Sequence, residues 1–352
     1  MTHRERAATA LQGGTPDFVP TFELCFLETG AAFGMEFFQG EEYDGLSWAE
    51  RRKLCRRNAE LYIRIAERYE HSVIVPTHFP STVFPQRYDE MRQTAEYLRE
   101  LENESHLILV HGDATYAIPD GEEVTAFVMR IADKPQEVHD QARAMVERRL
   151  AECETIMSWG TVDGFVLCSD YCFNSGPFLS PAMFGEFVAP YLKRLIGEQR
   201  RMGAYVIKHT DGNIMPIIDQ LVECRPHALH SLDPMAGVDI AEVKRLYGTQ
   251  VAICGNVNCA LMQEGTAEEI ERSAQYALQY GKPAGGYIFC TSNCVFPGMP
   301  LKSYDLMLDI WRKHRGYLFY DPRGGLIMGG EAGPDVPLCN VEAMLKSIYE
   351  RR

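Results

Sequence analysis

The sequence predicts an α/β fold in which eight parallel strands alternate with helices and close into a (β/α)8 barrel with small insertions. Eight short, apolar, β-branched runs recur along the 352 residues, and most are followed by a stretch that suits an amphipathic helix. With 46% hydrophobic residues, the chain can bury a large core as one domain spanning residues 1–352. A doubly wound open sheet is the alternative that the same pattern allows.

The elements follow one another in a regular order. Thr2 and Glu5 form a capping-box pattern ahead of a first helix, which Gly13-Gly14 ends. The predicted strands are Val19–Cys25, Ser72–Thr77, Leu107–His111, Gly164–Ser169, Ala204–Lys208, Ala228–Leu232, Val251–Val257 and Gly286–Thr291. The predicted helices include Trp48–Tyr69, Gln136–Trp159, Pro181–Met202, Ile240–Tyr247, Ala267–Tyr280 and Leu301–Lys313.

Two segments lie outside this repeat. Glu123–Ile131 reads EVTAFVMRI, which predicts an extra strand inserted after the third barrel strand. Tyr317–Pro337 is rich in Gly and Pro, which predicts a loop. A terminal helix is expected after it, with Asn340 as its N-cap.

Composition and charge argue against several classes of partner. The net charge is −14, from 49 acidic and 35 basic side chains, which suits neither duplex nucleic acid nor an anionic membrane. The charged start, Met1–Arg6, is unlike a secretory signal, and no run approaches the roughly 18 apolar residues of a membrane span. The eleven cysteines form no CxxC pair, so we expect reduced, mostly buried thiols in a cytoplasmic protein.

Polar side chains end each of the eight apolar runs. In barrel enzymes the active site lies at the carboxyl ends of the strands, so these positions are the first candidates. Each has a structural alternative, such as a cap or an Asx-turn, and the ring as a whole carries the prediction. Its members are Glu23, His78, His111 with Asp113, Asp170, His209 with Asp211, Asp233, Asn256, and Asn293 with Cys294.

The segment His209-Thr210-Asp211-Gly212-Asn213 is the strongest candidate. Side chains at i and i+2 point to the same side where a strand ends, and Gly212 suits a tight turn with close backbone approach. Imidazole and carboxylate are ordinary zinc ligands, and Cys294 would complete a set of three. A hydrogen-bonded pair of His209 and Asp211 without metal fits the pattern equally well.

Four segments resemble the uroporphyrinogen decarboxylase superfamily, which implies a (β/α)8 barrel. They are Asn174–Pro181, Lys208–Asn213, Gly255–Asn258 and Asn293–Pro300, in the family's order. Decarboxylases of the superfamily carry an Arg-rich amino-terminal motif and an Asp that ends the second strand. The corresponding stretches here, Phe22–Phe26 and Val75–His78, have neither, so porphyrinogen decarboxylation is not expected.

Within the superfamily, the sequence is similar to the cobamide-dependent methyltransferases. Members that methylate a thiol carry His-x-Cys at the fifth strand and a Cys at the last strand, and all three bind zinc. This chain has His209 and Cys294 but Asp211 in the middle, which makes a bound zinc a better Lewis acid. The change favours demethylation of an ether, most of all a methoxylated aromatic. A thiol or folate methyltransferase, a decarboxylase or lyase of another acid, and a non-catalytic binding protein are the alternatives.

The resemblance also implies roles and partners. His209, Asp211 and Cys294 would hold zinc or the substrate oxygen, and His78, His111 or Tyr171 would supply a proton. The cobamide would arrive on a separate corrinoid carrier protein, because this chain shows no cobalamin-binding module; a homodimer is left open. The predicted substrate contacts are Glu23, His111, Asp170, Asn174, Asn256 and Phe296, with Tyr116 and Phe173 as further aromatic walls.

Overall fold

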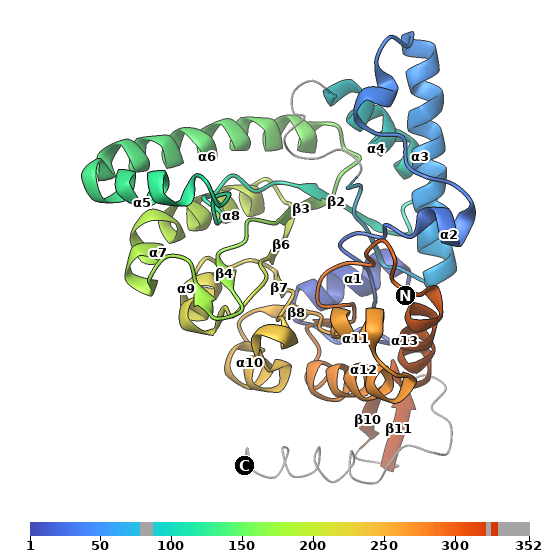
Figure 1. The fold of residues 1–352 in the computed structure, drawn as a ribbon. Helices are drawn as coiled ribbons and strands as arrows, with labels where there is room; N and C mark the ends of the chain where they lie inside the picture. The colour runs from blue at the N-terminus through green and yellow to red at the C-terminus, as the bar shows by residue number, and fades with distance from the viewer. Residues whose placement is uncertain (78–86, 322–324, 330–352) are drawn as a thin grey trace.

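The computed structural model describes residues 1–77, 87–321 and 325–329 (Figure 1). Among these, seven parallel strands form one curled sheet in the order β1-β2-β3-β6-β7-β8-β9. The strands lie at the predicted runs, which confirms the α/β class. They are β1 (Val73–Ile74), β2 (Leu107–His111), β3 (Gly164–Leu167), β6 (Tyr205–His209), β7 (Ala228–His230), β8 (Ala252–Cys254) and β9 (Tyr287–Ile288).

The first predicted strand, Val19–Cys25, is an extended segment without continuous pairing. Pro20 lacks the N–H group that a sheet ladder needs, which limits pairing there. Thr21 still makes isolated parallel bridges to His71 and to Phe289. The segment therefore contacts both edges of the curled sheet, next to β1 on one side and β9 on the other.

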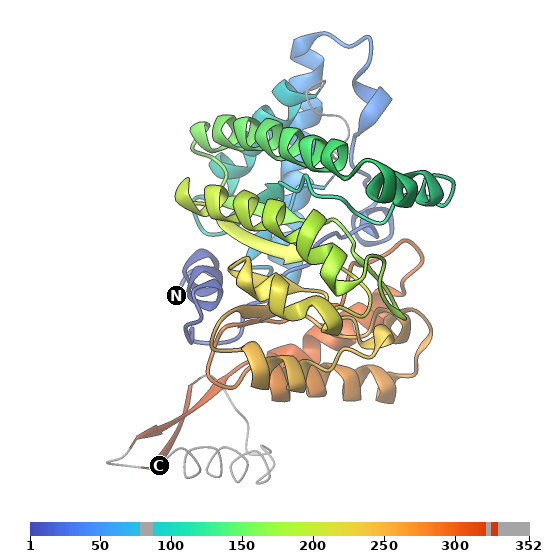
Figure 2. The ribbon, with the colours of Figure 1, turned by 90° about the vertical axis from the view of Figure 1, so that its left-hand side faces the viewer.

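Helices cover the outside of the sheet. In Figure 2, α6, α8 and α10 lie one above another in front of the strands. Predicted helices are confirmed, but Pro181–Met202 divides into two helices at Val188, because Pro190 has no N–H group to continue the first one. The larger helices are α3 (Trp48–Tyr69), α4 (Tyr88–Glu102), α6 (Pro135–Ser158), α7 (Pro181–Phe187), α8 (Ala189–Arg201), α10 (Ile240–Tyr247), α12 (Ala267–Gly281) and α13 (Leu301–His314).

Shorter elements connect these layers. Two strands, β4 (Cys172–Phe173) and β5 (Gly176–Pro177), form an antiparallel hairpin after β3. The short helices are α2 (Thr29–Phe33), η1 (Gly40–Tyr43), η3 (Met215–Ile217), α9 (Ile218–Glu223), η4 (Pro234–Ala236) and α11 (Cys259–Glu264).

Helix α1 (His3–Leu11) closes the amino-terminal end of the sheet. The predicted capping box of Thr2 and Glu5 is present. Ala7, Ala10 and Leu11 join an apolar cluster inside the curled sheet, the interior cluster, which receives a side chain from each of the seven strands. Its other buried members are Phe22, Leu24, Val73, Val75, Leu107, Leu109, Val166, Ile207, Ala228, Ala252, Cys254, Ile288, Cys290 and Cys294.

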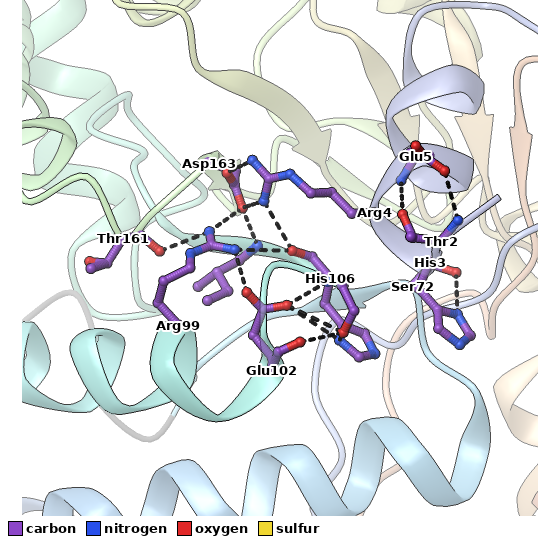
Figure 3. Close-up of polar contacts among 12 residues, drawn as sticks. Thr2, His3, Arg4, Glu5, Ser72, Arg99, Glu102, His106, Thr161 and Asp163 are labelled. Atoms are coloured by element: carbon purple, nitrogen blue, oxygen red, sulfur yellow. Dashed lines mark hydrogen bonds and ion pairs between the residues drawn. The ribbon is translucent and has the colours of Figure 1, made fainter.

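A polar clamp fastens α1 to the strands (Figure 3). Arg4 donates a hydrogen bond to Asp163 at 2.8 Å, and Arg99 from α4 donates to the same carboxylate at 2.6 Å. The backbone N–H of Ile108 also donates to Asp163, at 2.8 Å. Asp163 thus joins α1, α4 and β2 at the end of the sheet opposite the candidate site.

The segment predicted as an extra strand is a helix, so that prediction was wrong. Helix α5 spans Val124–Asp133. Phe127 and Ile131, four residues apart, are buried on one face, whereas Val128 and Met129 are exposed. The spacing of the buried residues follows a helical period, and the β-branched content of the segment was misleading.

The predicted loop Tyr317–Pro337 contains an antiparallel pair of strands, so the prediction was wrong in part. Strand β10 (Tyr317–Asp321) pairs with β11 (Gly325–Gly329), and the pair projects from the body of the molecule (Figure 1). Aromatic and aliphatic runs of this kind suit a strand. Residues 330–337 and the predicted terminal helix at Asn340 lie outside the described residues.

Two expectations from the sequence concern the state of the cysteines and the presence of membrane-spanning helices. Every cysteine in the described part of the chain is free, and only Cys25 and Cys168 are less than fully buried. Among the described residues, no helix combines the length and the apolar character that a membrane crossing requires.

Candidate active site

Three predicted residues come together at the carboxyl end of the sheet. Asp170 follows β3, His209 is the last residue of β6, and Asp211 lies two residues further on. One donor atom from each lies within 4.8 Å of the others. The Nε2 atom of His209 is 3.7 Å from an oxygen of Asp211 and 3.9 Å from an oxygen of Asp170. We call these residues the Asp170–His209–Asp211 group.

The turn after β6 depends on Gly212, as the sequence predicted. Its φ of +80° lies in the left-handed region, and a Cβ atom there would overlap the carbonyl oxygens of Cys172 and Phe173. The hairpin β4–β5 can therefore pack on the turn, and Asn213 N–H donates to the Phe173 carbonyl at 3.0 Å. In the same turn, Asp211 N–H donates to the Asp170 carboxylate at 2.9 Å, which orients Asp170.

Asp211 is held by two neighbours and carries an elevated pKa. Ser231 donates from its hydroxyl to one carboxylate oxygen at 2.6 Å, and the Asn293 amide donates to the other. Burial, together with the negative charges of Asp170 and Asp233, raises the pKa of Asp211 to about 7 against the opposing effect of Ser231. Asp211 therefore exchanges a proton near neutral pH when no cation is beside it.

The Ser231 contact requires an unusual backbone. Ser231 and Leu232 have φ values of 87° and 50°, in the left-handed region that residues other than glycine rarely adopt. The Asn256 amide donates to the Leu232 carbonyl at 2.7 Å and holds this conformation. Strain of this kind is concentrated at functional sites. Ser231 was not predicted as a site residue, because a serine within an apolar run gives no signal of its own.

His209 is a buried, neutral imidazole. Its side chain is 5% exposed, and burial followed by the neighbouring Lys208 charge lowers its pKa to about 3. Its Nδ1 atom lies 2.8 Å from Nδ1 of His230 on the adjacent strand β7. The hydrogen bond fixes the ring so that Nε2 faces Asp170 and Asp211.

Lys208 and Asp113 form a buried ion pair beside the site. The Lys208 ammonium donates to Asp113 at 2.9 Å and to the Ser169 carbonyl at 2.9 Å. Burial alone would raise the pKa of Asp113, but Lys208 and the hydrogen bonds to the carboxylate outweigh it and lower the pKa to about 2. Asp113 is therefore ionised, and its carboxylate is bound to Lys208.

Tyr171, predicted as a proton donor, belongs to the same buried network. Its hydroxyl shares a 2.6 Å hydrogen bond with Thr115, and Thr115 also donates to Asp113. Burial raises the pKa of Tyr171 well above its usual value. Its hydroxyl is engaged with Thr115 in this structure, and its role as a proton donor stays a prediction.

Glu23 faces away from the Asp170–His209–Asp211 group, and its contact with substrate stays a prediction. Phe22 and Leu24 on either side of it enter the interior cluster, and alternate residues of an extended segment point to opposite faces. Glu23 accepts hydrogen bonds from the Thr291 backbone at 3.2 Å and hydroxyl at 2.5 Å, and lines a small cavity under α3 with Tyr62. Burial raises the pKa of Glu23 to about 8.

The buried carboxyl of Glu23 predicts a pH-dependent stability. Because its folded pKa is raised from 4.5 to about 8, its contribution is complete below pH 4.5 and is lost as pH rises through 8. In a Glu23→Gln variant, the unfolding free energy relative to wild type should rise between pH 5 and pH 8, by up to about 1.4 kcal/mol per pH unit. Urea unfolding at both pH values measures this difference. An equal difference at both would contradict it, and the exposed Glu60→Gln variant is the control.

Comparison with known proteins shows the family to which the chain belongs. Residues 114–314 match the model of the uroporphyrinogen decarboxylase (URO-D) family. The chain belongs to the URO-D family. It is similar in fold to a methyltransferase from Methanosarcina mazei, with a TM-score of 0.68 and 17% identity over 88% of this chain and 98% of that chain. An arabinopyranosidase from Geobacillus stearothermophilus gives a TM-score of 0.44 and 11% identity over 89% and 81% of the two chains. None of the curated proteins matches the chain.

Cys294, the third zinc ligand predicted from the URO-D superfamily pattern, has a different neighbour here. The bridge between Phe26 and Val295 sets Cys25 beside Cys294. Their thiols share a hydrogen bond, and this bond together with burial raises the pKa of Cys294. Within the described residues, the group of three metal-competent donors contains Asp170 in place of Cys294. The predicted set His209, Asp211 and Cys294 is therefore not assembled in this structure.

The remaining predicted contacts of this URO-D member are spread around the site. Asn174 lies at the exposed turn of the β4–β5 hairpin, and Phe296 is half-buried against the core. His111 ends β2, and burial followed by the Arg149 charge lowers its pKa. Asn256 supports Leu232 as described, and His78 lies outside the described residues.

The two predicted aromatic walls differ in exposure. Tyr116 is held by a hydrogen bond of 3.0 Å from its hydroxyl to the Val138 carbonyl, and its ring packs on Phe127. Phe173 is 49% exposed on β4, beside the turn that carries Asp211. Of the two, Phe173 is the more exposed, and its ring also meets Phe178 edge to face.

Proposed function

We propose that this URO-D family member is a corrinoid-dependent methyltransferase. It would move a methyl group between a small methylated substrate, most of all a methoxylated aromatic, and a corrinoid on a separate carrier protein. The observation that carries the proposal is the Asp170–His209–Asp211 group at the carboxyl ends of parallel strands. The fold likeness to a protein named as a methyltransferase supports the same class.

We also propose that the scaffold is a closed eight-stranded barrel. Thr21 bridges to residues beside both edge strands of the curled sheet, which supports Val19–Cys25 as its eighth strand. Phe22 and Leu24 join the interior cluster with side chains from all seven strands. A filled interior with polar groups at one end is the arrangement of barrel enzymes.

The donor set fits a divalent metal, and we propose zinc. One imidazole nitrogen and two carboxylate oxygens lie within 4.8 Å of one another, and zinc accepts both ligand types. The Asp211 backbone N–H holds the Asp170 carboxylate, and Ser231 holds the Asp211 carboxylate as supporting residues do at metal sites. Zinc bound by these oxygen-rich ligands would act as a Lewis acid towards an ether oxygen.

The chain's own residues orient the substrate and manage its proton. When an ether methyl group leaves for the corrinoid, its oxygen retains the bonding electron pair and requires a proton or a positive charge. With a pKa near 7, Asp211 can hold that proton at neutral pH when it binds no metal. Phe173, exposed beside the turn, offers a ring against which an aromatic substrate can stack.

Metal analysis of variants tests the ligand assignment. Wild-type protein purified without chelator is expected to contain stoichiometric zinc, which His209→Ala and Asp170→Asn should lose. Cys294→Ser should retain the zinc, because the Cys294 thiol forms a hydrogen bond with Cys25 instead. If Cys294→Ser loses zinc while Asp170→Asn keeps it, the third ligand is Cys294 and not Asp170. Protein without any metal would contradict the zinc proposal.

A methyl-transfer assay tests the reaction itself. The protein is mixed with cob(I)alamin as the methyl acceptor and with methoxyaromatics, methylamines or methylthiols as donors. We expect methylcobalamin, followed by its absorbance, with a methoxyaromatic donor and not with His209→Ala. The absence of methylcobalamin from every donor would reject the methyltransferase proposal and favour a lyase of the same family.

A further inference from the structure

His230 is a buried imidazole that the proposed reaction does not use directly. It is paired in register with His209 on the adjacent parallel strand, so both side chains point to the same side. The two ring centroids are 5.0 Å apart, and the two Nδ1 atoms are 2.8 Å apart. Its ring also contacts Phe22 of the interior cluster, edge to face at 5.6 Å.

The contact between two Nδ1 atoms admits one proton. One ring must donate from Nδ1 and the other must accept there, because two lone pairs or two N–H groups at 2.8 Å would repel. Both rings are buried, which favours the neutral imidazole with its single proton. The proton on Nδ1 of one ring therefore dictates which nitrogen of the other is protonated.

Two arrangements result, and they differ at the candidate site. If His230 donates, the second nitrogen of His209 carries its proton, and an N–H group faces Asp170 and Asp211. If His209 donates, its Nε2 presents a lone pair towards the same carboxylates, at 3.7 and 3.9 Å from their oxygens. A lone pair among carboxylate oxygens is favourable only with a cation between them, so the second arrangement is the metal-binding one.

We propose that His230 is a positioning residue. Its Nδ1 atom accepts a hydrogen bond from the Nδ1–H group of His209, which leaves the Nε2 lone pair of His209 facing a cation bound with Asp170 and Asp211. The inference rests on the proposed function and deepens it, by naming the residue that prepares the ligand. Metal-binding histidines usually donate their other N–H group to a fixed acceptor. Here the acceptor is a second imidazole.

The other nitrogen of His230 makes a purely structural role a poor explanation. Its Nε2 is buried and has no hydrogen-bond partner among the described residues. A buried polar atom without a partner is destabilising, and an apolar side chain would pack beside Phe22 without that cost. Within the described part of the chain, the one polar contact of the His230 side chain is the contact with His209.

Three substitutions of His230 separate positioning from packing. Asn places a carbonyl oxygen near the Nδ1 position, Gln places its amide near the Nε2 position, and Leu supplies neither. The affinity for Zn²⁺ is measured by competition with a chelator, and Co²⁺ absorption reports the ligand geometry. We expect a loss of about 10- to 100-fold in affinity for His230→Leu and His230→Gln, and recovery to within a few-fold for His230→Asn.

A matched control lies on the same segment. His227, just before β7, accepts a hydrogen bond from Val206 N–H at 3.0 Å, at the end of the strand away from the site. His227→Leu should leave the metal affinity unchanged, and thermal unfolding of each variant checks that it is folded. Equal affinity in all the His230 variants, or an equal loss in all three, would overturn the inference.

The two proposals can fail separately. If wild-type protein binds zinc but transfers no methyl group, the proposed reaction is rejected. The zinc affinities of the His230 variants then still test the role of His230. Wild-type protein that transfers methyl groups while every His230 variant binds zinc like wild type would reject only the inference about His230. A wild-type protein that binds neither metal rejects the inference directly.

Discussion

Replacing Lys208 with Met is expected to lower the free energy of unfolding by about 3–5 kcal/mol. The Lys208 side chain is fully buried and Asp113 is 10% exposed, so removing the ammonium leaves a carboxylate without its cation inside the protein. The remaining donors to Asp113 include Thr115 and Ser169 N–H, which carry no full charge. Urea unfolding followed by circular dichroism measures the loss.

Removing both partners should recover much of this loss. The double variant Lys208→Met with Asp113→Asn leaves no buried charge, and a buried pair is often replaceable by neutral groups. Because the pKa of Asp113 is lowered from 3.8 to about 2, its contribution to stability is present above pH 3.8 and is lost as pH falls through 2. That acid dependence should weaken in Lys208→Met. A single-variant loss below about 1 kcal/mol, the range of exposed pairs, would contradict the assignment.

Replacing Asp163 with Ala should have an effect of similar size, again about 3–5 kcal/mol. The Asp163 side chain is 9% exposed and binds Arg4, Arg99 and Ile108 N–H, so its loss leaves Arg4 without a carboxylate and Arg99 with Glu102 alone. Hydrogen exchange should show the largest loss of protection in α1, because Arg4 is its link to the strands.

An exposed ion pair provides the control for Asp163. Arg56 and Glu60 are paired on the surface of α3 with side chains 44% and 49% exposed. Solvent screens such pairs, so Glu60→Gln should change the unfolding free energy by no more than about 0.5 kcal/mol. If Asp163→Ala were as mild as Glu60→Gln, the clamp would not hold the amino-terminal helix.

The fold was predictable wherever one period dominated a segment. Trp48–Tyr69 and Ile240–Tyr247 have the predicted bounds, because capping residues at their starts coincide with a helical pattern of buried side chains. Glu123–Ile131 was misjudged because its residue types favour a strand while the spacing of Phe127 and Ile131 favours a helix. The packing partner decides such cases, and a single sequence does not show it.

The site was predictable to the extent that it depends on where strands end. Asp170, His209 and Asp211 lie after neighbouring strands, so the topology brings them together. Glu23 also lies near the end of a predicted strand. Its neighbours Phe22 and Leu24 point into the interior cluster, so Glu23 points to the opposite face of the segment. His230 and Ser231 remained unseen, since polar residues inside an apolar run resemble ordinary core positions until the neighbouring strand is known.

The position of α1 has a consequence for how the chain reaches this structure. The helix is synthesised before every strand that it covers, and its residue Arg4 meets Asp163 only after 159 further positions. It also packs against β9, near residue 287, close to the end of the strand series. Contacts so distant along the chain form slowly, because a long loop must close before they stabilise anything. Helix α1 is therefore made before the strands that it covers but docks on them late.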